Sequence, residues 1–207
     1  MTSEGDFLVT VGIPTFNRPE GLRTTLEAIC SQTYKNLEIL VSDNCSTDPE
    51  VGKVLAEFSV SDPRVRIYRH DSGIAAVFNF FYLLDRASGK YFMWAADDDW
   101  WHPDFVEVCV NLLTKSPGAS VAVARFQPLP DPSGKKRLIP PGFDKIREIQ
   151  HPDLVTRLKR YIGQKESFGK AHITYGLFPL DDIRESVETL RKLVDDVMPS
   201  RTSPRWT

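Results

Sequence analysis

Three consecutive aspartates, Asp97, Asp98 and Asp99, follow a short apolar run that ends at Ala96. Carboxylates this close repel one another: at roughly 5.5 Å and an effective dielectric constant of about 20, each pair costs about 3 kcal/mol. A divalent cation would relieve the repulsion, and hard oxygen ligands suit Mg²⁺, Mn²⁺ or Ca²⁺. Taken alone, the triplet is equally compatible with a solvated acidic turn. It therefore predicts a metal site only if other segments bring a ligand to it.

The triplet ends a predicted strand, residues 91–96, whose apolar composition is typical of a strand buried on both faces. Two earlier strands, predicted at 7–13 and 37–42, also end in polar motifs, which read Pro14-Thr15-Phe16-Asn17-Arg18 and Asp43-Asn44-Cys45-Ser46-Thr47-Asp48. The carboxyl ends of parallel strands meet at one edge of a sheet, where open α/β folds bind their ligands. We therefore expect the three motifs to converge on one crevice.

Apolar residues at helical spacing fill the intervals between these strands. Pro19 suits the first turn of a helix, and Asp48 before Pro49 is a good N-cap. With a further strand at 65–68 and a helix at 73–87, the order up to the helix that follows Pro103 is βαβαβαβα. This order predicts an α/β fold with a mainly parallel sheet covered by helices on both faces.

The character of the chain changes after residue 126. Residues 127–150 hold five prolines and two glycines without sustained periodicity, which is typical of a long functional loop. We expect strands at 119–126 and 172–178 and a last helix at 183–194.

The composition limits the class of protein. With 207 residues, 41% of them hydrophobic and 26% charged, the chain can form one globular domain. A net charge of −2 provides no basic field, so no nucleic-acid partner is expected. The longest apolar runs are strand-sized, so we expect no transmembrane segment and no signal peptide. Three widely spaced cysteines, Cys30, Cys45 and Cys109, indicate free thiols in a reducing cytoplasm.

The three polar motifs together suit a nucleoside diphosphate. Asp43 can accept a hydrogen bond from a base N–H, and Thr15 offers a hydroxyl. Arg18, near a helix start, can meet phosphate oxygens. A cation held by the aspartates would bridge the two phosphates.

These motifs resemble glycosyltransferase family 2, which has the GT-A fold. The resemblance runs through residues 11–18, 32–48, Asn79 and 89–104, and it covers about residues 7–115. It implies a Rossmann-like, GT-A-like sheet, a nucleotide-diphosphate-sugar donor (a UDP-sugar favoured), Mn²⁺ or Mg²⁺, and inversion at the anomeric carbon. It also implies surface glycan or polysaccharide biosynthesis, a glycan or lipid-linked acceptor, and a cytoplasmic protein compatible with a peripheral position at the inner membrane face.

The resemblance also implies roles for single residues. Contacts to the nucleotide sugar are expected from Pro14, Thr15, Asn17, Arg18, Asp43, Asn44, Asn79, Asp97 and Asp98. The family's Asp-x-Asp can be read as Asp97-x-Asp99, or one residue earlier with Asp98 last. In an extended chain Asp97 and Asp99 share a face and Asp98 lies opposite. We favour Asp98 and Asp99 as the metal ligands.

The resemblance further implies a catalytic base in an acidic pair of the C-terminal half, where a carboxylate would remove the proton of the acceptor hydroxyl. Asp181-Asp182 reads as a helix N-terminal cap. Asp195-Asp196 is the favoured base, although a solvated helix end has the same appearance. We expect residues 1–126 to form the nucleotide-sugar-binding half and residues 127–207 the acceptor-side region, within a single compact domain.

Two other functions compete with a glycosyltransferase. A truncated or inactive sugar-nucleotide-binding module is the first, because the chain stops soon after Asp196, where relatives commonly continue. A sugar nucleotidyltransferase is less favoured, because it needs a glycine-rich loop after the first strand and residues 14–18 contain no glycine. Of the tryptophans, Trp94 is expected in the core, while Trp100 and Trp101 suit either packing or stacking on a sugar.

Overall fold

The computed structural model describes residues 6–124, 151, 153–163 and 170–197. Contacts divide the chain into two compact units, residues 1–122 with 177–207, and residues 123–176. The described part of the second unit holds helix α5 (Leu154–Gly163) and a 3₁₀ helix, η3 (Lys170–Tyr175). The predicted division of roles at residue 126 stays a prediction.

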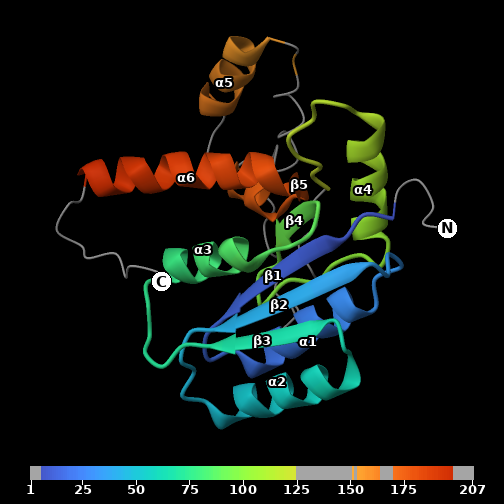
Figure 1. Ribbon diagram of the computed structural model, residues 1–207, viewed down its shortest axis with the longest axis vertical. Coiled ribbons are helices and arrows are strands. Elements are labelled where there is room, and N and C mark those ends of the chain that lie inside the picture. Colours follow the sequence, from blue (N-terminus) through green and yellow to red (C-terminus); the bar gives the residue numbers. More distant parts are fainter. Residues whose placement is uncertain (1–5, 125–150, 152, 164–169, 198–207) are drawn as a thin grey trace, which may run out of the picture. The chain divides into compact units, whose positions relative to one another are not determined.

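The first unit is built on a five-stranded sheet in the order β3-β2-β1-β4-β5 (Figure 1). The strands are β1 (Val9–Thr15), β2 (Leu37–Asp43), β3 (Val65–Arg69), β4 (Tyr91–Trp94) and β5 (Phe178–Pro179). Strands β1 to β4 pair in parallel, and β5 pairs antiparallel with β4. The mainly parallel sheet predicted from the sequence is therefore confirmed, and β1 and β2 are buried along their whole length.

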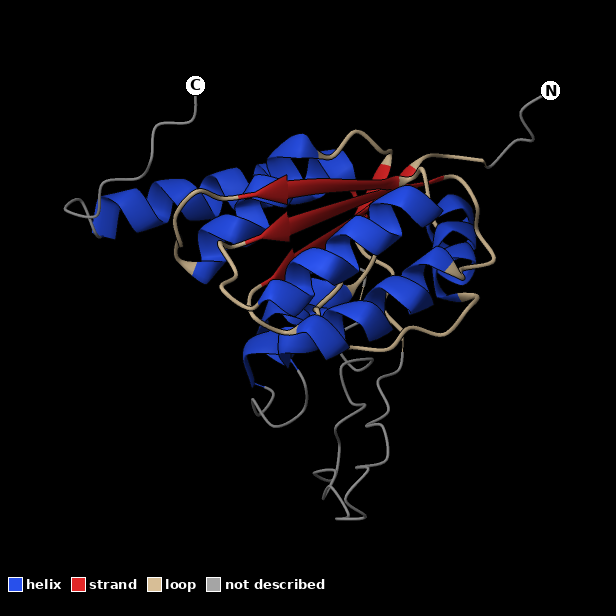
Figure 2. Ribbon diagram, turned by 90° about the horizontal axis from the view of Figure 1, so that it is seen from below, coloured by secondary structure: helices blue, strands red, loops and turns tan. Residues whose placement is uncertain are grey.

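Helices cover both faces of this sheet, as the edge-on view in Figure 2 shows. They are α1 (Pro19–Cys30), α2 (Pro49–Ser61), α3 (Ala76–Arg86), α4 (Phe105–Lys115) and α6 (Leu180–Val197). The core lies between sheet and helices, and its largest fully buried side chains include Ile13, Leu22, Leu26, Ile29, Ile39, Leu40, Leu83, Leu84 and Phe92. Within the described residues, no helix has the length and apolar character needed to cross a membrane.

Two predicted helix starts are confirmed, whereas the helix predicted at 73–87 begins later, at Ala76. Pro19 opens α1, and the Asp48 side chain accepts a 2.9 Å hydrogen bond from the backbone N–H of Glu50 at the start of α2. The first strand, however, does not stop before Pro14 but continues to Thr15. Strand β4 ends at Trp94, which pairs with Gly12, so β1 and β4 no longer pair at residue 14. Pro14, which has no backbone N–H, is therefore tolerated there.

Two predicted strands were wrong in extent. Between residue 119 and the last described residue before the gap, 124, the chain makes an isolated antiparallel bridge, Ala122 to Leu177. Residues 125 and 126 and the predicted loop at 127–150 lie outside the described residues. The strand predicted at 172–178 is mostly η3, and β5 begins only at Phe178 and pairs with β4 over two residues, Phe178 and Pro179. The last helix is confirmed and begins earlier than predicted, at Leu180.

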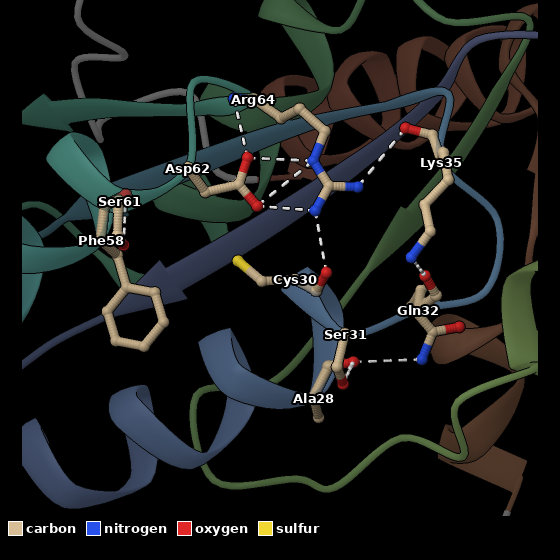
Figure 3. A network of polar contacts seen from close by, with 9 residues as sticks. All are labelled: Ala28, Cys30, Ser31, Gln32, Lys35, Phe58, Ser61, Asp62 and Arg64. Atoms are coloured by element: carbon tan, nitrogen blue, oxygen red, sulfur yellow. Dashed lines mark hydrogen bonds and ion pairs between the residues drawn. The ribbon is translucent and has the colours of Figure 1, made fainter.

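The amino ends of the strands form one edge of the sheet, here called the amino edge, and Arg64 fastens the loops there. Its Nη2 donates to Asp62 Oδ2 (2.6 Å) and to the carbonyl of Cys30 (2.8 Å), and its Nη1 donates to the carbonyl of Lys35 (3.4 Å) (Figure 3). Hydrogen bonds from Arg64 lower the pKa of Asp62 to about 2. This network joins the end of α1 to the chain before β2 and β3.

A second network at the amino edge centres on Glu38, whose side chain is buried. Its carboxylate accepts hydrogen bonds from the Thr10 hydroxyl (2.7 Å) and from both the backbone N–H and the hydroxyl of Ser88 (3.0 and 2.9 Å). Arg66 adds a 3.2 Å ion pair. Both oxygens of Glu38 are therefore partnered.

Candidate functional site

Three strands bring polar residues to the opposite, carboxyl edge of the sheet, the side to which the arrowheads of β1, β2 and β3 point in Figure 1. Thr15 ends β1, Asp43 ends β2, and the two are register partners. The aspartates follow β4, whose last residue, Trp94, pairs with Gly12 of β1. The three motifs therefore meet at one edge, as their strand ends predicted.

Residues 96–99 form a turn, here called the aspartate turn, with Asp97 and Asp98 at its centre. Asp97 is 8% exposed, and the Thr15 hydroxyl donates to its Oδ2 over 2.8 Å. Asp98 is exposed and Asp99 is half-buried. Because the backbone turns here, the extended arrangement with Asp97 and Asp99 on one face does not apply, and the three carboxylates differ in exposure.

Arg18, the residue before α1, brings a positive charge to this turn. Its Nη1 lies 2.6 Å from Asp98 Oδ2 and 3.3 Å from Asp97 Oδ1. Burial raises the pKa of Asp97, while the Thr15 hydrogen bond and the Arg18 charge act in the opposite direction. Arg18 and Asp98 are both more than half exposed, so their ion pair is weak and can exchange partners.

Asp99 lacks such compensation. Burial raises its pKa, and the charges of Asp98 and Asp97 raise it further. In the described part of the chain, no three His, Cys, Asp or Glu side chains are grouped so that they could hold a metal ion. A cation at this edge would therefore take further oxygen ligands, from water or from a bound molecule, in addition to the aspartates.

Asp43 is fully buried at the end of β2. Its Oδ1 accepts a 3.0 Å hydrogen bond from the Ser46 backbone N–H, whereas its buried Oδ2 has no hydrogen-bond partner. Arg69 Nε lies 3.3 Å from Oδ2 as an ion pair, and Arg69 Nη2 donates to the Ser46 carbonyl. Arg69 was not among the residues predicted at this edge, although it ends β3 just as Asp43 ends β2.

The two asparagines of the polar motifs hold loops together. Asn17, at a left-handed φ of 53°, accepts hydrogen bonds through its Oδ1 from the backbone N–H groups of Thr47 (2.8 Å) and Asp48 (3.0 Å). Asn44 exchanges two 2.8 Å hydrogen bonds with the backbone of Ile74. Their expected contacts to a nucleotide sugar stay predictions.

Asn79 and Pro14 are enclosed by the fold. Asn79, on α3, is 3% exposed. Its Oδ1 accepts from the Ser42 hydroxyl (2.6 Å) and lies 3.1 Å from His70 Nε2, and its Nδ2 donates to the Ser42 carbonyl (3.0 Å). Pro14 is buried within β1. Their expected donor contacts also stay predictions.

The tryptophans differ in exposure. Trp94 is buried in the core, as expected, and its Nε1 donates to the Phe80 carbonyl. Trp101 is buried and packs edge-on against Phe105, with ring centroids 4.8 Å apart. Trp100 is 49% exposed beside the aspartate turn. Of the two tryptophans that follow the triplet, Trp100 is the one available for stacking.

Helix α6 carries both acidic pairs of the C-terminal half. Asp181 and Asp182 lie exposed in its first turn, where negative charge favours a helix start. The backbone of Asp195 and Asp196 lies in its last turn, and their side chains are outside the described part. Their role as catalytic base stays a prediction.

Comparison with known proteins gives a match to a protein family. Residues 10–180 match the model of a family described as glycosyl transferase family 2. Glycosyltransferase GlyA of Streptococcus pneumoniae is 35% identical over 122 residues, 58% of this chain and 17% of its own length. The Escherichia coli protein WfgD, named a UDP-Glc:alpha-D-GlcNAc-diphosphoundecaprenol beta-1,3-glucosyltransferase, is 31% identical over 111 residues, 54% of this chain and 43% of its own length. The chain thus spans less than half of either relative.

Solved structures support the fold. The structure of TarS residues 1–349 of S. aureus in complex with UDP-GlcNAc aligns with a TM-score of 0.64 at 14% identity, over 86% of this chain and 47% of that one. The mannosyltransferase PcManGT of Pyrobaculum calidifontis, in complex with GDP-Man and Mn²⁺, aligns with a TM-score of 0.58 at 19% identity, over 88% of this chain and 46% of that one. At these identities the likeness concerns the fold alone, and it agrees with the expected GT-A-like sheet.

Proposed function

Because the chain belongs to glycosyltransferase family 2, we propose that it moves a sugar from a nucleotide-diphosphate-sugar donor to an acceptor hydroxyl, with inversion at the anomeric carbon. The observation that carries this proposal is the position of Thr15. It is the register partner of Asp43, and its hydroxyl donates to Asp97. It therefore joins the polar ends of β1, β2 and β4, where one donor nucleotide can reach all three.

The base of the donor is proposed to lie at Asp43. Its Oδ2 is a buried acceptor without a hydrogen bond, and such an atom gains from a donor N–H. Uracil and guanine both carry a ring N–H, and UDP-sugars are the favoured donors. Structurally similar proteins have been solved with UDP-GlcNAc and with GDP-Man, so the guanine nucleotides form the second class to test.

A divalent cation, Mn²⁺ or Mg²⁺, is proposed at Asp98 and Asp99. Asp98 is exposed. Burial and two acidic neighbours raise the pKa of Asp99, so added positive charge would reduce the repulsion among the three carboxylates. These residues fit a cation that takes one or two carboxylates and completes its shell with phosphate oxygens. When bound, the cation would stabilise the negative charge of the departing nucleoside diphosphate.

Arg18 is proposed to contact the diphosphate. Its exposed guanidinium pairs with Asp98 and Asp97, and its fork of donors also matches phosphate oxygens. A diphosphate would thus replace the exposed Arg18–Asp98 ion pair with another exposed ion pair, at little cost. The remaining predicted donor contacts, by Pro14, Asn17, Asn44 and Asn79, belong to the same proposal.

In the proposed reaction the acceptor oxygen bonds to the anomeric carbon while the bond from that carbon to the phosphate oxygen breaks. The nucleoside diphosphate leaves with the electron pair, and a carboxylate takes the hydroxyl proton. Asp195 and Asp196 are proposed as this base. Donor binding is assigned to residues 1–126 and the acceptor side to residues 127–207.

The acceptor and the pathway are proposed from the relatives' names. WfgD is named for an acceptor with a diphosphoundecaprenol group, so we propose a glycan or lipid-linked acceptor and a role in surface glycan or polysaccharide biosynthesis. The three cysteines are free in the structure, in keeping with a cytoplasmic protein. A lipid-linked acceptor would place the protein at the inner membrane face.

Calorimetry with UDP and with GDP, in the presence and absence of Mn²⁺, tests donor binding. We expect binding to require the cation and to weaken sharply in Asp98→Ala. Equal affinity with and without Mn²⁺ would contradict the proposed role of the aspartates. Donor hydrolysis and transfer are then measured across a panel of sugar nucleotides, and binding without turnover in either assay would favour a binding module over an enzyme.

A further inference from the structure

One buried hydroxyl holds the aspartate turn at both of its ends. The Oγ1 atom of Thr25, a fully buried residue on α1, lies 2.9 Å from the carbonyl oxygens of both Ala96 and Asp99. A hydroxyl has one hydrogen, so the two carbonyls share it. The turn's own hydrogen bond, from Asp99 N to Ala96 O, is long at 3.4 Å. Thr25 therefore supplies a link that the turn makes poorly by itself.

Gly21, one helical turn before Thr25, lets the aspartate turn lie directly on the helix. A β-carbon at this position would come within 2.4 Å of the Asp97 carbonyl oxygen and 3.3 Å of the Asp98 α-carbon. Residues four apart share a helix face, so Gly21 and Thr25 form one surface, here called the α1 face. The α1 face contacts the carbonyls of Ala96, Asp97 and Asp99.

Two residues just past the end of α1 hold the chain that follows the turn. Gln32, fully buried just past the end of α1, donates through Nε2 to the His102 carbonyl (2.8 Å) and accepts through Oε1 from Val106 N (3.1 Å). The backbone N–H of Thr33 donates to the Pro103 carbonyl (2.8 Å). Residues 96–106 are thus bonded to Thr25 of α1 and to Gln32 and Thr33 just past its end, and of these three Thr25 is the one that bonds the backbone of the aspartate turn.

We propose that Thr25 is a positioning residue for the aspartates, an inference that rests on the proposed function. Asp97 and Asp98 meet Thr15 and Arg18 through side chains whose directions depend on the turn between Ala96 and Asp99. Arg18 directly precedes α1, so the helix that carries the cationic partner also fixes the anionic turn. Without the Thr25 hydroxyl, the Asp99 carbonyl loses this donor and the Ala96 carbonyl keeps only the long bond from Asp99 N, so the turn has to rearrange.

The test compares Thr25→Val, which keeps the shape and removes the hydroxyl, with Thr25→Ser, which keeps the hydroxyl. Thr24→Val is the matched control, because Thr24 is the exposed neighbour whose hydroxyl bonds only within the helix, to the Glu20 carbonyl. Two quantities are measured on the full chain: amide hydrogen exchange of residues 96–104 without ligand, and the affinity for UDP with Mn²⁺.

We expect Thr25→Val to speed exchange selectively in residues 96–104 and to weaken Mn²⁺–UDP binding about tenfold, the size of effect seen when a group that orients metal ligands is lost. Thr25→Ser should stay within about twofold of the wild type, since the hydroxyl orients the ligands and the methyl does not. Thr24→Val should match the wild type in both measurements. A merely structural role would lower overall stability but leave the affinity of the folded protein unchanged.

Unchanged affinity in Thr25→Val, with or without faster exchange, would overturn the positioning role. Loss of affinity in Thr25→Ser equal to that in Thr25→Val would overturn it as well, because the hydroxyl would then not be the cause. If the wild type binds no nucleoside diphosphate, the proposed function fails instead. Amide hydrogen exchange is then the remaining test of whether Thr25 holds the turn. Unaltered exchange of residues 96–104 in Thr25→Val would contradict the proposal for Thr25.

Discussion

The two edges of the sheet hold acidic residues in opposite electrostatic situations. At the amino edge, hydrogen bonds from Arg64 lower the pKa of Asp62 to about 2, and Glu38 is fully partnered. At the carboxyl edge, burial raises the pKa of both Asp97 and Asp99. The first arrangement stabilises the folded chain at neutral pH, and the second destabilises it.

This difference indicates which edge is built for a ligand. A structural network satisfies its own donors and acceptors, as Glu38 does with Thr10 and Ser88. The carboxyl edge leaves the buried Asp43 Oδ2 without a hydrogen bond and crowds three carboxylates into one turn. Proteins accept such local costs where a bound molecule relieves them.

The largest expected effect comes from breaking the amino edge. Glu38→Ala leaves the Thr10 and Ser88 hydroxyls without their carboxylate acceptor, and we expect the free energy of unfolding to fall by about 4 kcal/mol. Urea denaturation measures this loss. Affinity for Mn²⁺–UDP, corrected for the folded fraction, should not change. Glu57→Ala, which removes an exposed partner of Arg23, is the control and should leave stability nearly unaltered.

The converse change acts on the carboxyl edge. Asp98→Asn removes the charge of an exposed carboxylate, so we expect affinity for Mn²⁺–UDP to fall about 100-fold, equivalent to about 2.8 kcal/mol. Unfolding in the absence of ligand should hardly change. Calorimetry and urea denaturation on the same sample separate the two effects, with Asp85→Asn, another partly exposed acid paired with an arginine, as the control. A large loss of stability with intact binding would remove the contrast between the edges.

The sequence predicted which residues reach the carboxyl edge, because apolar runs and helix signals determine where parallel strands end. Thr15, Asp43 and the aspartates follow from that order alone. The sequence did not predict which of the side chains are already engaged. Asn79, whose expected contact to the donor stays a prediction, forms three polar contacts with Ser42 and His70 that the sequence did not indicate. Such contacts depend on strand register and side-chain rotamers, which no local pattern encodes.

The resemblance to the family has a similar limit. The matching segment 32–48 contains Gln32, Glu38 and Asp43, but the first two hold the scaffold and the third lies at the candidate site. Thr25 and Arg69 lie outside every motif that the sequence analysis used. Thr25 acts on the backbone of a turn more than 70 residues away, which the structure alone reveals.

A smaller effect tests the charge of the amino edge. Because the pKa of Asp62 is lowered in the folded state, its stabilisation is complete above the unfolded pKa and is lost as the pH falls through the folded pKa of about 2. We expect Asp62→Asn to cost about 1.5 kcal/mol at pH 7, allowing for partial solvent exposure. The difference from the wild type should shrink below about pH 4. Denaturation at several pH values measures it, and a difference that persists at pH 2 would contradict the Arg64 ion pair as its source.

The smallest effect has the opposite sign. Burial and the charges of Asp98 and Asp97 raise the pKa of Asp99, so the folded chain binds its proton more tightly than the unfolded chain. Stability therefore falls as the pH rises from the unfolded pKa through the folded one, and the penalty is complete above it. We expect Asp99→Asn to raise the free energy of unfolding at pH 7 by about 0.5 kcal/mol, a value reduced for solvent screening.

This gain should disappear at about pH 3, where Asp99 is protonated in both states and the substitution removes no charge. It should also reverse when Mn²⁺ and UDP are added, because the ligand would then stabilise the wild type more than the variant. Denaturation at pH 7 and pH 3, each with and without ligand, gives the four values needed. If Asp99→Asn lowers stability at pH 7 without ligand, the carboxyl edge does not carry the unrelieved charge that sets it apart from the amino edge.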